Sequence, residues 1–163
     1  MKTYDFAPIA AREYPTVQLL DNPYIWGGVQ LSINVSEKPY SPELMKAMRE
    51  HGISWFGCSV SEDEGENWFD ALRWALRIMV TSYMTGMKMV VHCDFGNNRS
   101  RTFVEAFYYV LKGEQLHDEY KGEFNHLIYN CKQGHLPPVE ILEKHLNDLR
   151  QIIIEAQQKQ VKS

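Results

Sequence analysis

One cysteine of this chain lies among residues suited to phosphate chemistry. Cys93 is followed, after five intervening residues, by Arg99 and then by Ser100. Only the thiolate form of cysteine is a good nucleophile, and a nearby guanidinium or helix N-terminus favours that form. The guanidinium is also a planar fork that binds two phosphoryl oxygens at once. We therefore expect Cys93 to attack phosphorus, Arg99 to hold the phosphoryl group, and Ser100 to donate a hydrogen bond to the sulfur when it leaves.

The residues between this cysteine and this arginine suit a loop that wraps an anion. Gly96 lets the backbone adopt positive φ and approach a ligand, and Asn97 and Asn98 tolerate left-handed conformations. The backbone N–H groups of such a loop converge in front of the following helix, whose dipole adds positive potential. We expect phosphate to be bound by the whole stretch Cys93, Asp94, Phe95, Gly96, Asn97, Asn98 and Arg99. A carboxylate facing the anion would repel it, so the Asp94 side chain is expected to point outward.

The run His92-Cys93-Asp94-Phe95-Gly96-Asn97-Asn98-Arg99-Ser100 resembles a known signature. The signature, His-Cys-x5-Arg-Ser/Thr, is that of the cysteine-dependent protein tyrosine phosphatases, and the likeness is greatest to their compact dual-specificity branch. The resemblance is specific only at the loop. A weaker similarity in the order of strands and helices extends from residue 24 to residue 149. The resemblance implies a phosphatase that uses a phosphocysteine intermediate and needs no cofactor or metal. It also implies that His92 structures the loop and takes no part in proton transfer.

A general acid is needed as well, because an alkoxide or phenolate is a poor leaving group until it is protonated. Similar phosphatases place an aspartate about thirty residues before the cysteine, on the loop after the preceding strand. Asp63 is thirty residues before Cys93 and follows an apolar stretch over 53–60. We therefore expect Asp63 to be the general acid. Glu62 and Glu64 flank it, and either would be the acid if the register of this loop differed by one residue.

The elements around this loop predict an α/β fold with a central, mostly parallel sheet flanked by helices. A short apolar stretch over 87–91 predicts the strand that leads into Cys93, and a helix is expected over 100–111. Ser41, Pro42 and Glu43 are typical of a helix start, and Gly52 of its end. The remaining expectations are an irregular arm over 1–15, short strands over 16–20 and 24–31, a strand over 53–60, and helices over 67–83, 118–133 and from 137 onward.

Composition narrows the functional classes. The 163 residues predict a single phosphatase domain over 1–163, and 44% apolar with 23% charged residues is ordinary for a globular protein. A formal net charge of -4 disfavours nucleic acid as a partner. Three widely spaced cysteines form a poor disulfide framework and indicate reduced thiols, so we expect a cytoplasmic protein without a membrane span.

Three functions remain open from the sequence. The first is a phosphatase acting on phosphotyrosine in a protein or peptide, with phosphoserine and phosphothreonine as further substrates and a small phosphate ester as a model substrate. The second is a phosphatase for inositol phosphates or phosphoinositides, although this loop carries no lysine. The third is a binding module for phosphorylated motifs that keeps the anion cradle but has lost turnover. The intact set of Cys93, Arg99 and Ser100 favours an enzyme over a binder.

Overall fold

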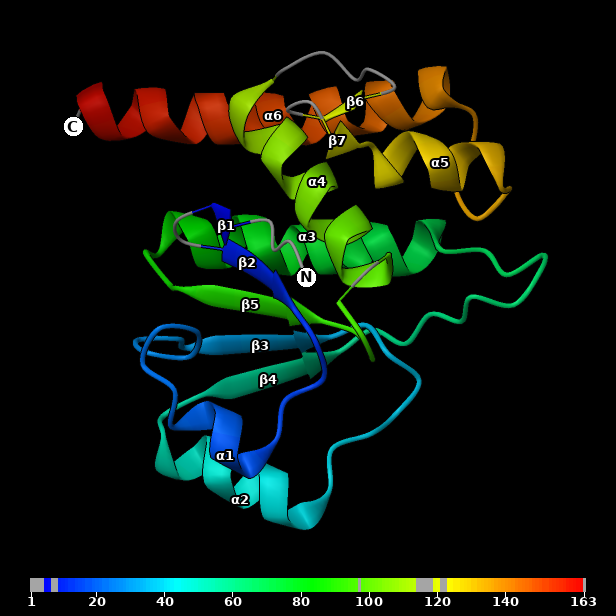
Figure 1. The fold of residues 1–163 in the computed structure, drawn as a ribbon. Coiled ribbons are helices and arrows are strands. Elements are labelled where there is room, and N and C mark those ends of the chain that lie inside the picture. Colours follow the sequence, from blue (N-terminus) through cyan, green and yellow to red (C-terminus); the bar gives the residue numbers. More distant parts are fainter. Residues whose placement is uncertain (1–4, 7–8, 97, 114–118, 121–122, 163) are drawn as a thin grey trace.

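A five-stranded sheet forms the centre of the protein (Figure 1). The computed structural model describes residues 5–6, 9–96, 98–113, 119–120 and 123–162. The strand order is β1-β2-β5-β3-β4, and the last four of these strands run parallel, whereas β1 is antiparallel to β2. The strands are β1 (Asp5–Phe6), β2 (Ile9–Arg12), β3 (Leu31–Asn34), β4 (Ser54–Gly57) and β5 (Met89–His92). The expectation of a mostly parallel sheet is confirmed.

Helices cover both faces of this sheet and bury two separate apolar cores. The short helices α1 (Val17–Leu20) and α2 (Pro42–Glu50) cover one face, and α3 (Phe69–Met84), α4 (Arg99–Lys112), α5 (His126–Lys132) and α6 (Val139–Lys162) lie on the other side (Figure 1). On β5 the side chains alternate between the two cores, because successive residues of a strand point to opposite faces. Val90 packs with α1 and α2, whereas Met89 and Val91 pack with the larger helical layer.

The helix α4 lies at the centre of the larger layer. All of its residues from Arg99 to Val110 are buried, as expected for a helix that is surrounded by protein. It ends at Gly113, whose φ of 67° is the left-handed conformation that commonly terminates helices. Because α4 begins at Arg99, the predicted helix after the cysteine is confirmed and its N-terminus lies at the site.

Several predicted elements are correct. The side chain of Ser41 caps α2 as expected, accepting a bond from the amide of Leu44 at 3.1 Å. The strand over 53–60 is β4, the helix over 67–83 is α3, the strand over 87–91 is β5, and the helix from 137 is α6. None of the helices in the described residues is both long enough and apolar enough to cross a membrane.

Four predictions about secondary structure are wrong. The arm over 1–15 contains strands β1 and β2, because β2 pairs along β5 and is stabilised by a neighbour distant in sequence. Residues 17–20 form a helix instead of a strand, since the Thr16 hydroxyl caps the amide of Leu19 at 3.1 Å. A strand was expected over 24–31, but turns occupy most of 21–28 and β3 begins only at Leu31. In place of one helix over 118–133, the described residues there form β6 (Glu119–Tyr120), β7 (Glu123–Phe124) and the shorter α5.

Candidate active site

The candidate nucleophile lies where the parallel strands end. Cys93 directly follows β5, and the loops after β3 and β4 reach the same edge of the sheet. The amide of Val35 donates to the carbonyl of His92 at 3.0 Å, which joins the loop after β3 to the end of β5. The carboxyl ends of parallel strands are where α/β folds usually bind ligands. Cys93 is buried, with 3% of its surface exposed.

Two polar groups contact the sulfur of Cys93. The amide of Gly96 lies 3.2 Å from Sγ, and Oγ of Ser100 lies 3.3 Å from it. Both groups lie within hydrogen-bond distance of the atom that would form the bond to phosphorus. The structure thus places Ser100 beside Sγ of Cys93, the atom to which it was expected to donate a hydrogen bond.

Gly96 cannot readily be replaced in this loop. Its φ is 73°, and a Cβ atom added to it would lie 2.9 Å from the carbonyl carbon of Arg12. The segment after β2 therefore packs directly on the loop, and the amide of Tyr14 donates to the carbonyl of Asp94 at 3.1 Å. This contact gives β2 and the residues after it a role in shaping the site.

Arg99 is held at the floor of the site by bonds from both of its terminal nitrogens. Its Nη1 lies 2.9 Å from the carbonyl oxygen of Val60, and its Nη2 lies 2.9 Å from Oδ2 of Asp94. Within the described part of the chain, its buried Nε has no hydrogen-bond partner, because Oε1 of Glu62 is 3.7 Å away. A buried donor without a partner is costly. A bound anion that accepted from Nε would remove this cost.

The expectation that Asp94 points outward is wrong. Its carboxylate forms an ion pair with Arg99, and 40% of the side-chain surface remains exposed. Arg99 is deeply buried, and the attraction of its charge outweighs the better solvation that Asp94 would gain by turning outward. Oε1 of Glu37, from the loop after β3, also lies 3.8 Å from Nη1 of Arg99. Arg99 is therefore surrounded by carboxylates.

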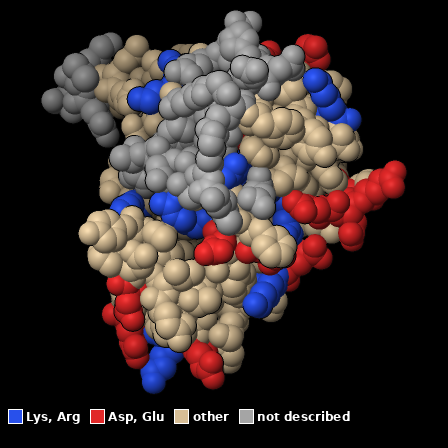
Figure 2. Space-filling view, in the orientation of Figure 1, with Lys and Arg blue, Asp and Glu red and all other residues tan. Residues whose placement is uncertain are grey.

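The acidic loop after β4 carries the candidate general acid. Asp63 is exposed, its amide bonds to Oγ of Ser61 at 3.1 Å, and its carbonyl accepts from the amide of Glu66 at 3.2 Å. Glu62, the residue before it, lines the pocket that contains Cys93, whereas Asp63 is not among the described residues of that lining. Figure 2 shows acidic side chains gathered over this loop at one edge of the molecule.

His92 is buried on the opposite side of β5 from the helical layer of α4. Its Nε2 lies 2.5 Å from the hydroxyl oxygen of Tyr40, and the two rings stack at 5.5 Å. Burial lowers the pKa of His92 to about 3, so the ring is neutral at physiological pH. Its surroundings fit the structural role that the resemblance implies. Asn97, which was expected to bind phosphate, lies outside the described residues.

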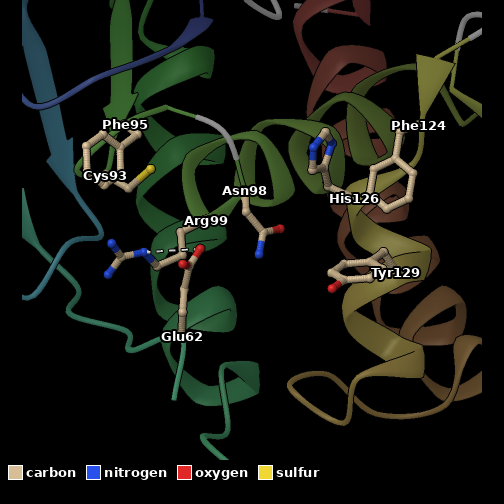
Figure 3. Close-up of a pocket in the computed structure, with 8 residues that line it drawn as sticks. All are labelled: Glu62, Cys93, Phe95, Asn98, Arg99, Phe124, His126 and Tyr129. Carbon is tan, nitrogen blue, oxygen red and sulfur yellow. Dashed lines mark ion pairs between the residues drawn. The ribbon is translucent and has the colours of Figure 1, made fainter. Parts of the chain in front are cut away.

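A pocket of about 450 Å³ opens above Cys93 (Figure 3). The loop after β4, the cysteine loop, β7 and α5 all contribute to its walls, with side chains from Glu62, Cys93, Phe95, Asn98, Arg99, Phe124, His126 and Tyr129. Figure 3 shows Phe95 on one side and Phe124, His126 and Tyr129 on the other. The second group was not predicted, because the sequence pattern over 118–133 indicated a single helix with no part in the site.

The other cysteines differ from Cys93 in their environment. Burial raises the pKa of Cys58 and of Cys131 to about 11, so both are protonated thiols at neutral pH. All three cysteines are free. Within the described residues, the histidines, cysteines and carboxylates form no group of three that could hold a metal ion.

Comparison with known proteins places the fold. No family model and no curated protein matches the chain. Among solved structures, DUSP15 superposes with a TM-score of 0.66 at 17% sequence identity, covering 94% of this chain and 95% of that one. The core catalytic domain of the PP-IP phosphatase SIW14 from S. cerevisiae gives a TM-score of 0.60 at 11% identity, covering 92% and 88%. Human DUSP28 gives 0.57 at 16% identity, covering 96% and 99%.

The architecture is therefore that of the cysteine-dependent phosphatases. More narrowly, the chain has the fold of the compact dual-specificity branch, which the loop sequence around Cys93 had indicated.

Proposed function

We propose that this chain is a phosphoric monoester hydrolase that removes phosphate from phosphotyrosine in proteins or peptides, through a phosphocysteine at Cys93. One observation carries the proposal. Cys93 and Arg99 are buried together at the base of one pocket, with the amide of Gly96 directed at the sulfur and Nε of Arg99 without a partner in the described residues. This combination supplies a nucleophile and a charged donor at the place where a phosphoryl group would lie.

The reaction would proceed in two displacements at phosphorus. In the first, Sγ of Cys93 forms the S–P bond, the ester P–O bond breaks, and the leaving oxygen takes a proton from a carboxylic acid. In the second, water attacks phosphorus, gives its proton to the same carboxylate, and the S–P bond breaks to release phosphate. Ser100 would stabilise the departing thiolate from 3.3 Å.

The acid remains assigned to the loop after β4. Asp63 keeps the position that the sequence analysis gave it, and its exposure allows the loop to bring it inward when substrate binds. If the loop does not move, Glu62 is the better candidate for the general acid, because it already lines the pocket.

The aromatic walls of the pocket support an aryl substrate. Phe95 is 71% exposed, Phe124 is 55% exposed and Tyr129 is 38% exposed, although each is a large apolar ring. Phe124 and Tyr129 lie 5.1 Å apart, and Phe95 faces them across the pocket (Figure 3). A phenyl ring between these walls would gain apolar contact and ring–ring interactions, whereas a serine or threonine side chain would not.

Inositol phosphates and phosphoinositides fit this pocket less well. Arg99 is the single lysine or arginine among the described residues of the lining, and Glu62 adds a negative charge. A substrate with several phosphates needs several cations, so the charge of this pocket favours one phosphoryl group on an otherwise uncharged ring.

Hydrolysis of an aryl phosphate by the purified protein tests the proposal. We expect turnover by the wild-type protein, none by Cys93→Ser, and a trapped adduct on Cys93 heavier by one phosphoryl group when the reaction is quenched in acid. A panel of phosphotyrosine, phosphoserine and inositol phosphate substrates then tests the specificity. Absence of turnover with retained phosphate binding would support a binding module for phosphorylated motifs. Turnover confined to inositol phosphates would support a phosphatase for inositol phosphates or phosphoinositides.

A further inference from the structure

A buried asparagine of α5 contacts the cysteine loop from the side. Asn130 is fully buried, and its Nδ2 lies 2.8 Å from Oδ1 of Asn98, 2.9 Å from Oγ1 of Thr102 and 2.8 Å from the carbonyl oxygen of His126. Asn98 is the last residue of the loop before Arg99 and lines the pocket. Asn130 therefore connects the wall that α5 forms to the residue beside the catalytic arginine.

The surroundings of Asn130 decide which way both amides face. The carbonyl of His126 can only accept, and the hydroxyl of Thr102 already donates to the carbonyl of Asn98 at 2.8 Å. The atom of Asn130 that faces them must therefore be the donor Nδ2. The atom of Asn98 that meets Nδ2 must in turn be an acceptor, its Oδ1. The Nδ2 of Asn98 is consequently not the atom that meets Asn130, and Figure 3 shows the Asn98 side chain among the residues that line the pocket.

We infer that Asn98 is a further catalytic residue whose Nδ2–H donates to the apical oxygen of the reaction, with Asn130 as the residue that positions it. The inference rests on the proposed phosphatase function. The apical oxygen is the ester oxygen in the first displacement and the attacking water in the second, and both lie opposite the sulfur. The loop amides and Arg99 would bind the three equatorial oxygens, so Asn98 would act at the apical oxygen, beside the carboxylic acid that exchanges a proton with it.

The chemistry of the second displacement explains why an amide suits this place. The attacking water must give a proton to a carboxylate and direct a lone pair at phosphorus. Glu62 lines the same pocket and presents an acceptor, while Asn98 presents a donor. A donor and an acceptor together fix the orientation of a water molecule. An amide does not titrate, so it orients the water without competing for its proton.

Presteady-state kinetics with an aryl phosphate tests this assignment. Asn98→Ala should slow hydrolysis of the phosphocysteine by about tenfold to a hundredfold, and more than it slows its formation. The variant should therefore show a burst of released phenol close to one equivalent per enzyme. Asn130→Leu should give the same burst with a smaller loss. The double variant should be no slower than Asn98→Ala alone, since both changes act on one donor.

The matched control is Asn147→Ala, which removes an asparagine that accepts from the hydroxyl of Tyr109 at 3.1 Å on the far helix α6. Its rates should equal those of the wild-type protein. Equal slowing of both displacements in Asn98→Ala would overturn the role in water activation. Additive losses in the double variant would overturn the coupling to Asn130.

Binding of vanadate provides a readout independent of turnover. With ¹⁵N-asparagine labelling, the side-chain signals of Asn98 should shift on addition of vanadate, and those of Asn147 should not. Vanadate binding without a shift of the Asn98 signals would overturn the inference while leaving the proposed function intact. Failure of vanadate to bind at all, together with absence of turnover, would overturn the proposed function and the inference with it.

Discussion

The hydroxyl oxygen of Tyr40 lies 2.5 Å from Nε2 of His92, the residue that precedes the candidate nucleophile. Ser32 on the adjacent strand β3 extends this contact, with its Oγ 2.8 Å from the same hydroxyl. The ring of Tyr14 packs edge-on against His92 at 5.3 Å, and its backbone amide binds the loop at Asp94. The end of β5 is thus fixed by polar and aromatic contacts on the side opposite the helical layer.

Removing the Tyr40 hydroxyl should loosen the end of β5. Tyr40→Phe leaves polar atoms of His92 and Ser32 buried without this partner, and we expect a loss of about 1–3 kcal/mol in the free energy of unfolding. Urea unfolding measures this loss. Tyr24→Phe is the control, because Tyr24 is 91% exposed and its change should have no measurable effect on stability. Equal stability of Tyr40→Phe and wild type would mean that this hydrogen bond adds nothing net.

Burial of His92 predicts a pH dependence of stability. Its pKa is about 3 in the folded protein, against an ordinary value of 6.5. Between these values the unfolded chain binds the proton and the folded chain does not, so stability rises with pH across this range and falls on acidification, by up to about 1.4 kcal/mol per pH unit. His92→Asn lacks this contribution, so the melting temperature of the wild-type protein relative to that of the variant should fall as the pH is lowered from 6.5 toward 3.

His51 serves as a control of opposite sign. The Ala47 carbonyl, followed by Asp21, raises the pKa of His51, so its contribution is present at low pH and is lost as pH rises through the folded value. His51→Gln should therefore lose stability at low pH relative to the wild-type protein. A slope in His92→Asn equal to that of wild type would show that other groups cause the acid sensitivity.

The loop around Cys93 could be predicted from the sequence better than the walls of the pocket could. Cys93, Arg99 and Ser100 are neighbours in sequence, and the loop that joins them follows from local rules on glycine and helix termini. Phe124, His126 and Tyr129 reach the pocket only because α5 packs against α4, a contact between segments that local patterns do not determine. The strand β2 was missed for the same reason, since it is stabilised by pairing with β5, nearly eighty residues away in the sequence.

The orientation of Asp94 shows a second limit. From the sequence, repulsion between its carboxylate and a phosphate predicted an outward side chain. In the structure the attraction of Arg99 decides the outcome, at 2.9 Å. The outward prediction took account of the phosphate but not of Arg99, and only the fold of the loop shows how close the Asp94 and Arg99 side chains lie.

The covalent mechanism predicts sharp losses at two residues. Cys93→Ser should abolish turnover while vanadate or phosphate binding persists, because a serine hydroxyl is not ionised at neutral pH. Arg99→Lys should lose most of its rate, since an ammonium group cannot reproduce the contacts of the guanidinium with Val60, Asp94 and the phosphoryl group. Steady-state rates and equilibrium binding measure both. Appreciable turnover in Cys93→Ser would contradict a phosphocysteine intermediate.

The ion pair of Asp94 with Arg99 predicts a gain of affinity on its removal. Asp94→Asn takes away a carboxylate that competes with phosphate for Nη2 of Arg99 and that repels it. We expect vanadate to bind about threefold to tenfold more tightly, which corresponds to about 1 kcal/mol. Glu64→Gln is the control, an exposed acid of the loop after β4 that leaves this pair intact. Weaker binding in Asp94→Asn would mean that Asp94 mainly holds the guanidinium in place.

The general acid can be identified from the pH–rate profile. If Asp63 is the acid, Asp63→Asn should lower the rate on a phenyl phosphate by a factor of about 10² to 10⁴. The loss should shrink for a substrate whose leaving group is a weak base, because that group departs without protonation. The basic limb of the wild-type profile reports loss of the acid's proton, so only that limb should flatten in the variant.

Glu62 makes the competing prediction. It already lines the pocket and lies 3.7 Å from Nε of Arg99, whereas Asp63 must move to reach the leaving oxygen. If Glu62→Gln removes the basic limb and Asp63→Asn does not, the acid is Glu62 and the register assigned from the sequence is off by one residue. Glu64→Gln is the control for general effects of charge on this loop and should leave both limbs in place. A basic limb that survives all three changes would show that the loop after β4 is a solvated surface, and it would strengthen the case for a module that binds phosphate without turning it over.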